Sequence, residues 1–318
     1  MIGGGGQRRG KSGFSPKAAP LKTFPPTGGP RRESPWLRLW RIIYPVGLHY
    51  LLTSAVYETA VILLELYQVY VEKNLSAVLL AERQRLAHLP CLGISSLLLL
   101  LLLRKFYQTD ETRRRLGYLG RPRQRKQVSG GMWAAAALLG AASSQCFNDL
   151  LEMAGINQRF SGYAQEAQLV YSGHSLLVLA VVTGLLTPAA EELIFRGLIQ
   201  KRLGDYLGSK WAVVLSALIF GLYHGYIPQV IFGVCVGLLL GLVLERTDQL
   251  LLALVIHMVS NLWSFGPGEA IHVLALTRSP AAWAVIALSG AAAAASLWYL
   301  CRGGPENPGH SKKKSLKA

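Results

Sequence analysis

Apolar segments long enough to cross a membrane alternate with short polar ones along most of this chain. Eight such segments follow one another, at residues 42–64, 87–103, 131–150, 175–202, 208–226, 228–245, 249–264 and 281–301. A transmembrane helix needs roughly 20 predominantly apolar residues. The pattern therefore predicts an all-α fold, a polytopic membrane bundle of about eight transmembrane helices, with residues 72–86 as a helical surface loop.

The polar segments define the other divisions of the chain. Residues 1–35 are rich in Gly, Pro, Lys and Arg, so we expect a disordered basic tail there. Residues 36–129 are expected to hold the first transmembrane helices and a basic cytoplasmic loop. Residues 266–301 should contain the last transmembrane helix, and residues 302–318 a second basic tail.

The charged residues agree with a membrane protein and indicate an orientation. Only 16% of the residues are charged, against about 25% in ordinary soluble domains, while the net charge is +16. With the N-terminus inside and eight crossings, 28 of the 33 Lys and Arg residues lie on the cytoplasmic side, as the positive-inside rule requires. We therefore predict a multi-pass protein with both termini in the cytoplasm, the lipid bilayer as a partner and no nucleic-acid partner.

Small residues mark one expected helix contact. Gly233, Gly237 and Gly241 recur at four-residue spacing in the sixth apolar segment, which predicts a close approach of another helix. The four cysteines stand singly within or beside apolar segments, and this favours packing roles over disulfides or metal ligands.

Polar side chains within the apolar segments are the candidate functional residues, because an ionisable group in a span costs roughly 2.5–3.5 kcal/mol. Glu192 and Arg196 lie four positions apart, so they share a helix face and can pair. Glu191 points about 100° away from Glu192 and stays available for chemistry. The alternative for this cluster is a salt bridge that ends a helix at the cytoplasmic surface.

Two further clusters lie on the next helices. His224 follows Phe220 by four positions, and His257 precedes Asn261 by four, so each pair shares a helix face. Taken alone, His224 is explained equally by a hydrogen bond to a carbonyl, and the other pair by an interhelical contact. Residue counts from the nearest charged position place these residues and Glu191 roughly 13–21 Å from the cytoplasmic boundary. This common depth predicts one intramembrane polar cavity shared by three helices.

These motifs resemble those of the CPBP family, the CAAX protease and bacteriocin-processing membrane endopeptidases, which includes the type II CAAX prenyl endopeptidases. The family pattern is Glu-Glu-x-x-x-Arg, Phe-x-x-x-His and His-x-x-x-Asn or Asp on successive helices. Here it stands at Glu191–Arg196, Phe220–His224 and His257–Asn261. The resemblance covers roughly residues 130–265, and it implies a catalytic membrane core there with a cavity reachable from the cytoplasm.

The resemblance also implies an activity. It implies an endopeptidase that hydrolyses a peptide bond in a membrane-associated peptide or protein substrate. In the prenyl-processing members this bond lies near the C-terminus of a lipidated protein, and in bacterial members the role is bacteriocin maturation or self-immunity. For the localisation we accordingly expect an integral protein of a bacterial cell membrane.

Two mechanisms fit the candidate residues. In the first, Glu191 with His224 deprotonates a water molecule, and His257 with Asn261 donates hydrogen bonds to the oxyanion. The Glu192–Arg196 pair then holds the helix and the local charge. In the second, Glu191, His224 and His257 bind a catalytic zinc ion with an open coordination position, although the sequence lacks a His-Glu-x-x-His motif. The sequence does not choose between a metal-free and a zinc-dependent site.

Two functions from other classes stay open at this point. A proton-coupled transporter would also use intramembrane Glu and His residues, although the internal repeat of many transporters is not found here. A non-catalytic immunity or scaffold protein would keep the same fold. Glu58 and Glu65, seven positions apart in the first apolar segment, are further candidates for a cavity or for the outer membrane boundary.

Overall fold

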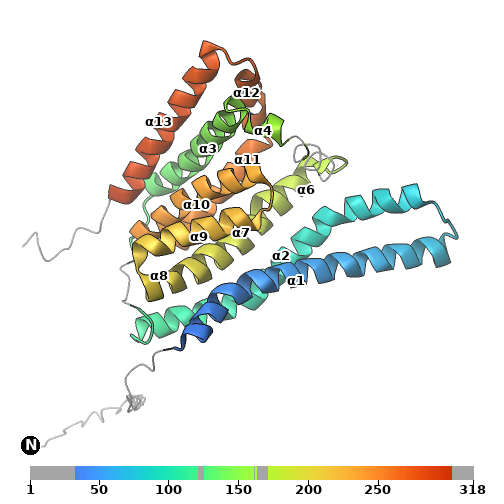
Figure 1. Cartoon of the computed structure of the whole chain (residues 1–318), viewed down its shortest axis with the longest axis horizontal. Helices are drawn as coiled ribbons and strands as arrows, with labels where there is room; N and C mark the ends of the chain where they lie inside the picture. The colour runs from blue at the N-terminus through green and yellow to red at the C-terminus, as the bar shows by residue number, and fades with distance from the viewer. Residues whose placement is uncertain (1–32, 121–124, 161, 163–170, 303–318) are drawn as a thin grey trace, which may run out of the picture. The chain divides into compact units, whose positions relative to one another are not determined.

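The computed structural model describes residues 33–120, 125–160, 162 and 171–302, and within them every regular element is a helix (Figure 1). Both predicted basic tails lie outside these residues, except for positions 33–35 and 302. Each of the eight apolar segments overlaps a helix. Among the described residues, five helices are long and apolar enough to cross a membrane, or six if one bent pair is a single span. The all-α membrane fold is therefore confirmed, whereas the count of eight crossings is not.

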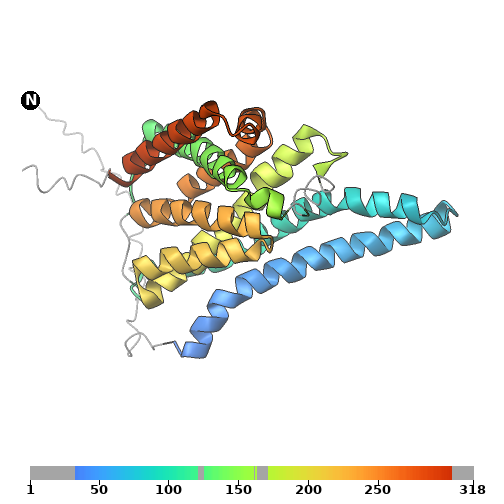
Figure 2. The same ribbon diagram turned by 45° about the horizontal axis from the view of Figure 1, so that its top comes forward.

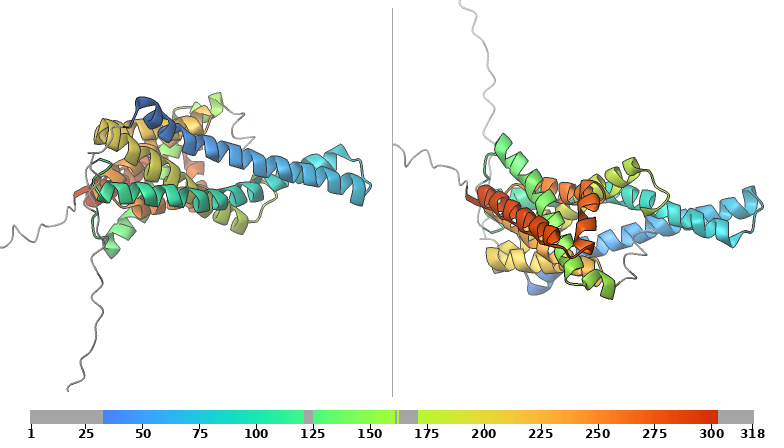
Figure 3. Two further views of the ribbon diagram at one scale, coloured as in Figure 1. Left: turned by 90° about the horizontal axis from the view of Figure 1, so that it is seen from below. Right: turned by 90° about the horizontal axis from the view of Figure 1, so that it is seen from above.

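The first two helices form a long antiparallel pair. α1 (Pro35–Leu66) is capped by the Ser34 hydroxyl and continues as a π-helical turn, Tyr67–Val71. α2 (Ala77–Arg115) also starts behind a serine cap, so the connection is shorter than the predicted loop 72–86. Figure 3 shows the two helices side by side. Many of their large apolar side chains are exposed, as expected for helices that face lipid.

The helix that carries the Glu-Glu motif is continuous but irregular. It consists of α6 (Leu176–Val181), α7 (Thr187–Glu192) and α8 (Lys201–Leu207), joined by the π-helical segments Val182–Leu186 and Leu193–Gln200. Pro188 explains the first of these, because proline has no N–H and its ring clashes with the carbonyl one turn earlier. A wider turn separates the ring from that carbonyl, and such π-helical turns are frequent at functional sites.

The remaining described helices complete the bundle. They are α3 (Gly130–Met153), α4 (Ile156–Arg159), α9 (Ser209–Tyr223), α10 (Ile227–Thr247), α11 (Leu250–Ser264), α12 (Pro267–Leu276) and α13 (Pro280–Arg302). α3 packs against α11 and α13, while α9 packs against α10. In Figure 2, α3, α12 and α13 lie on one side of α9 and α10, and α1 lies on the other side. α11 and α12 meet at a bend of 61°.

The glycines of α10 allow α9 to approach closely. A Cβ atom at Gly233 would lie 3.1 Å from Gly221 Cα, and one at Gly237 would lie 3.1 Å from Ala217 Cα. Neither position has room for a methyl group unless the backbones separate. The close contact predicted from the four-residue glycine spacing is therefore confirmed.

Ion pairs gather at one end of the bundle, which we name the basic end. Three buried pairs mark it, Arg202 with Asp110 at 2.7 Å, Arg114 with Asp205 at 2.8 Å and Lys201 with Asp248 at 2.9 Å. They join the ends of α2, α8 and α10, and Lys126 adds the end of α13 by donating to the Leu300 carbonyl at 3.4 Å. α3 and α11 begin at this end, so they finish at the opposite end of the bundle.

Candidate active site

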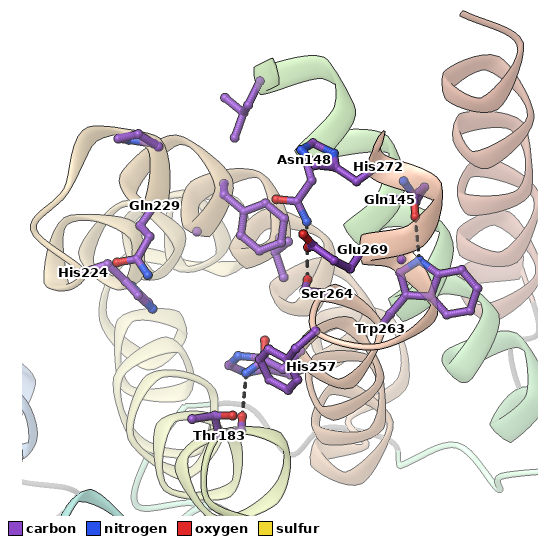
Figure 4. Close-up of a pocket in the computed structure, with 18 of the residues that line it drawn as sticks. Gln145, Asn148, Thr183, His224, Gln229, His257, Trp263, Ser264, Glu269 and His272 are labelled. Carbon is purple, nitrogen blue, oxygen red and sulfur yellow. Dashed lines mark hydrogen bonds between the residues drawn. The ribbon is translucent and has the colours of Figure 1, made fainter. Parts of the chain in front are cut away.

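A cavity of about 610 Å³ lies between α3, α7 and the helices α9 to α12 (Figure 4). Its wall includes four of the six residues singled out in the sequence, Glu191, His224, His257 and Asn261. In the view of Figure 4, His257 and Thr183 lie at the lower end, and His272 and Asn148 lie at the upper end. The polar cavity expected among the apolar helices is therefore present.

Glu192 and Arg196 lie behind the cavity wall and are paired. Arg196 Nη1 is 3.3 Å from Glu192 Oε1, and both side chains are almost completely buried. This confirms the pairing expected from the four-residue spacing. The same Glu192 oxygen also accepts a hydrogen bond from His257 Nδ1 at 2.9 Å. Glu192 therefore links α7 to α11, a contact that spacing along the chain does not predict.

Arg196 is held from two further directions. Its guanidinium carbon lies 4.2 Å from the centroid of the Phe220 ring, a cation–π contact. Its Nη2 donates to the Gly237 carbonyl at 3.4 Å. A Cβ atom at Gly237 would come within 3.3 Å of this nitrogen, so glycine leaves space for the guanidinium. The buried positive charge balances Glu192, which would otherwise be an uncompensated buried charge.

Glu191 faces the cavity and has a different neighbour from Glu192. Its Oε2 lies 3.6 Å from His257 Nε2, which exceeds direct hydrogen-bonding distance but closes with a small shift of either side chain. Within the described residues, no lysine or arginine pairs with Glu191. Because Glu192 fixes the Nδ1 side of His257, the imidazole presents Nε2 to Glu191. One carboxylate thus orients the histidine, and the other remains available.

His224 stands where α9 ends. The next residue, Gly225, has φ +80°, the left-handed conformation that terminates many helices. His224 Nδ1 lies 2.8 Å from the Phe220 carbonyl, so Nδ1 carries the proton and Nε2 keeps a lone pair. The carbonyl contact that would also explain a structural histidine is present, and it orients the ring. Among the described residues, no hydrogen-bond partner is found for Nε2.

Asn261 takes its position from the irregular helix opposite. Its Nδ2 donates to the Thr183 carbonyl at 2.9 Å. Thr183 lies five residues before Pro188, which has no N–H to close a π-helical turn onto that carbonyl. Asn261 therefore supplies the donor that the proline lacks, as buried backbone groups in a membrane require. No other side chain or carbonyl in the described part of the chain bonds its second amide hydrogen or its carbonyl oxygen, so both can contact a ligand.

The donor set proposed for zinc does not form a metal site in this arrangement. Among the described residues, no group of three His, Cys, Asp or Glu side chains is placed to hold a metal ion. Glu191 and His257 are close together, but His224 does not complete a three-ligand set with them.

Glu58 and Glu65 do not join the site. Both are exposed on α1, and Glu65 accepts a hydrogen bond from Gln84 at 3.3 Å. Neither residue lines the cavity. The sequence allowed two roles for these residues, in a cavity or at the outer membrane boundary. Their position does not fit the cavity role.

A second group of polar side chains lines the same cavity, and none of them was predicted from the sequence. Gln145 and Asn148 of α3 and His272 of α12 line it, and Asp149 lies behind His272. Gln145, Asn148 and Asp149 are polar residues near the end of the third apolar segment, and this pattern could have indicated the group. His272 lies outside the three motifs, so no sequence pattern indicated that it lines the cavity.

The cavity lies towards the end of the bundle opposite the basic end. Its lining comes from the far ends of α3 and α11 and from α12, so it extends away from the basic end. The membrane face from which the cavity is reached, and the cytoplasmic location of the basic end, both stay predictions. Counting residues from a charged boundary predicts the depth of a side chain in the membrane. It does not predict which helix ends enclose the cavity.

The comparison with known families agrees with the motif residues. Residues 173–263 match the model of the Rce1-like family, described as type II CAAX prenyl endopeptidase Rce1-like. This range contains all six motif residues. No curated protein and no solved structure matched the chain. Residues 173–263 are therefore similar to the type II CAAX prenyl endopeptidases, and this supports the resemblance of the motifs to the CPBP family.

Proposed function

We propose that this protein is an intramembrane endopeptidase in which Glu191 activates a water molecule to hydrolyse a peptide bond. The observation that carries the proposal is the Glu191–His257–Glu192 arrangement, in which contacts of 3.6 Å and 2.9 Å place one imidazole between two carboxylates. One carboxylate is bound to Arg196, and the other lines the cavity. Such an asymmetric pair of carboxylates is typical of general acid–base sites.

The proposed reaction begins at Glu191. Its carboxylate takes a proton from water, and the hydroxide attacks the carbonyl carbon of the scissile bond. The tetrahedral intermediate carries a negative oxygen, which accepts hydrogen bonds from Asn261 Nδ2 and from His257. The proton held by Glu191 then moves to the leaving nitrogen, so that the C–N bond breaks and an acid and an amine are released.

His224 has a supporting role in this scheme. Its Nδ1 is bound to the Phe220 carbonyl, so its Nε2 can accept a hydrogen bond from the water that Glu191 deprotonates. The ring of Phe220 lies between the two histidines, at 4.9 Å from His224 and 5.6 Å from His257 between ring centroids. Phe220 also covers Arg196, and it therefore fixes the spacing between the two imidazoles.

The substrate and the orientation belong to the same proposal. The family resemblance supports a membrane-associated peptide or protein, lipidated on a cysteine if CAAX-type processing applies. The distribution of Lys and Arg supports cytoplasmic termini, whereas the cavity direction supports access from the other membrane face. The bacterial cell membrane and the bacteriocin-related role stay predictions.

A cleavage assay in membrane vesicles tests the proposal. Peptides with and without a prenylated cysteine are incubated with the wild-type protein, and products are identified by mass spectrometry. Glu191→Gln should lower the rate by about 10²- to 10⁴-fold, the usual contribution of a general base. His224→Gln should lower it by less. Glu58→Gln, which changes an exposed carboxylate outside the cavity, is the matched control and should cleave as the wild type.

The alternative functions give different results in the same vesicles. If Glu191→Gln cleaves like the wild type, the proposed site is wrong. If no peptide is cleaved but a proton-coupled flux depends on Glu191, the protein is a transporter instead.

A further inference from the structure

The end of the cavity away from Glu191 contains a second carboxylate–histidine pair. His272 Nδ1 on α12 lies 2.6 Å from Asp149 Oδ1 on α3. The other Asp149 oxygen accepts from Gln145 Nε2 at 2.9 Å, and Gln145 accepts from Trp263 Nε1 at 2.8 Å. The Gln145–Trp263 contact is drawn in Figure 4. Three side chains from two helices thus fix the orientation of one imidazole.

The pair repeats the arrangement found at the other end of the same cavity. There, Glu192 binds His257 Nδ1, and here Asp149 binds His272 Nδ1. Asp149 is almost completely buried, whereas the His272 side chain keeps 24% of its surface exposed and lines the cavity. An imidazole held by a carboxylate at one nitrogen presents the other nitrogen in a fixed direction. Among the described residues, no hydrogen bond to His272 Nε2 is found.

The charge around His272 limits what this nitrogen can bind. Asp149 favours the protonated imidazole, so Nε2 acts as a hydrogen-bond donor. Glu152 and Glu269 line the same end of the cavity, and none of its described lining residues is a lysine or an arginine. A substrate carboxylate would therefore meet repulsion from these acids. A neutral acceptor, such as a main-chain carbonyl, would not.

We propose that His272 is a substrate-contacting residue that donates a hydrogen bond from Nε2 to a main-chain carbonyl of the bound peptide, beside peptide residues that are neutral or basic rather than acidic. The inference rests on the proposed function in that it takes the occupant of the cavity to be a peptide. The peptide then extends from Glu191 to His272. An internal segment of the peptide can therefore pass His272. A free C-terminal carboxylate of the peptide does not fit beside His272, because the acidic side chains there would repel it.

Direct peptide binding tests this inference separately from catalysis. Fluorescent peptides with blocked termini and a neutral sequence are scanned with Asp, Asn or Lys at each position. Their affinity is measured for the full chain in lipid nanodiscs, with Glu191→Gln as the non-cleaving background. In this background we compare His272→Ala, the larger His272→Gln and Asp149→Asn. Val273→Ala is the matched control, since Val273 is an exposed neighbour on α12 that does not line the cavity.

The expected result is a weaker complex without the His272 donor. His272→Ala should raise the dissociation constant about 10- to 100-fold, the effect of one lost hydrogen bond to a charged group, and Asp149→Asn should have a smaller effect. At one or two peptide positions, an Asp residue should weaken binding to the Glu191→Gln protein, compared with Asn or Lys at the same position. Val273→Ala should bind as this protein does. In the cleaving enzyme, His272→Ala should raise KM by a similar factor with little change in kcat.

Two results separate this inference from the proposed function. If the wild-type protein cleaves peptides and both His272 variants keep the original affinity and KM, the inference is wrong and the peptidase proposal stands. If nothing is cleaved but the His272 variants lose affinity, the peptide site stands and hydrolysis at Glu191 is wrong. Absence of peptide binding in every protein overturns the inference.

Discussion

Glu192 Oε1 accepts a hydrogen bond from His257 Nδ1 at 2.9 Å, across two helices and 65 positions of sequence. Because the same oxygen is 3.3 Å from Arg196 Nη1, Glu192 is the residue through which the Glu-Glu motif acts on the histidine of the third motif. Its role in the proposed reaction is to position His257, and Glu191 is the residue that contacts the reacting water.

This division of roles predicts unequal effects for the two glutamates. Glu192→Gln keeps the size of the side chain but removes the charge that orients His257, so kcat should fall about 10- to 100-fold, as for other residues that orient an active-site histidine. Glu191→Gln should cause the larger loss expected for a missing base. Rates measured in membrane vesicles at several pH values give the comparison. A Glu192→Gln enzyme with the wild-type rate and pH profile would contradict the positioning role.

Arg196 should be needed for stability as well as for activity. Arg196→Met leaves Glu192 buried without its cation, and breaking such a pair costs about 3–5 kcal/mol. Unfolding of the purified protein in detergent measures the effect, with Arg104→Met, an exposed arginine on α2, as the control. The double variant Glu192→Gln with Arg196→Met should be less destabilised than the sum of the single variants, since no unpaired charge remains. Simple additivity would show that the pair is not coupled.

The parts of the site that were predictable from the sequence are those set by spacing within one helix. Glu192 and Arg196 are four residues apart and do pair, and Gly233 and Gly237 do meet the neighbouring helix closely. Both follow from 3.6 residues per turn. The apolar segments likewise predicted where helices occur, because the bilayer accepts little else.

The parts that were not predictable depend on how the helices pack. The contact of Glu192 with His257 and that of Asp149 with His272 each join two helices. Asp149 reaches His272 because α12 is bent by 61° relative to α11. Hydrophobic periodicity gives no information on such a bend or on which helix ends enclose a cavity.

The glycines at the α9–α10 contact predict a size limit. A Cβ atom at Gly221 would lie 2.4 Å from Val234 Cγ2 and 2.7 Å from the Val230 carbonyl oxygen. Gly221→Ala should therefore destabilise the protein by about 1–3 kcal/mol, as overpacking does, and lower activity by moving His224. Gly47→Ala on α1 is the matched control, because no atom lies within 4 Å of the added Cβ. It should be neutral or stabilise by up to about 1 kcal/mol. Equal effects at both positions would contradict the packing argument.

Glu33 predicts a pH dependence of stability near the start of α1. Burial disfavours its charged form, but the Tyr206 hydroxyl, at 2.8 Å, and the guanidinium groups of Arg41 and Arg113 outweigh this and lower the pKa of Glu33. A lowered folded-state pKa stabilises the protein above the unfolded value of about 4.3, and this contribution is lost as the pH falls through the folded-state pKa. Glu33→Gln should lower Tm at pH 7 and have less effect below about pH 4.

The matched control for this pH effect is Glu72→Gln. Glu72 pairs with Arg83 at 2.8 Å in an exposed position, where ion pairs contribute little. Its Tm should stay near that of the wild type at both pH values. If Glu33→Gln and Glu72→Gln show the same Tm across the pH range, the cluster around Glu33 does not contribute as proposed.

The arrangement of Glu191, His224 and His257 also predicts the response to metal removal. The described residues contain no set of three side chains placed for a metal ion, and Glu192 already occupies His257 Nδ1. Dialysis against a strong chelator should therefore leave the cleavage rate unchanged, and elemental analysis of the active protein should find much less than one zinc ion per chain. Loss of activity on chelation that zinc alone restores would contradict the metal-free mechanism. It would assign Glu191, His224 and His257 to zinc, because a bound ion can draw ligands together that are apart without it.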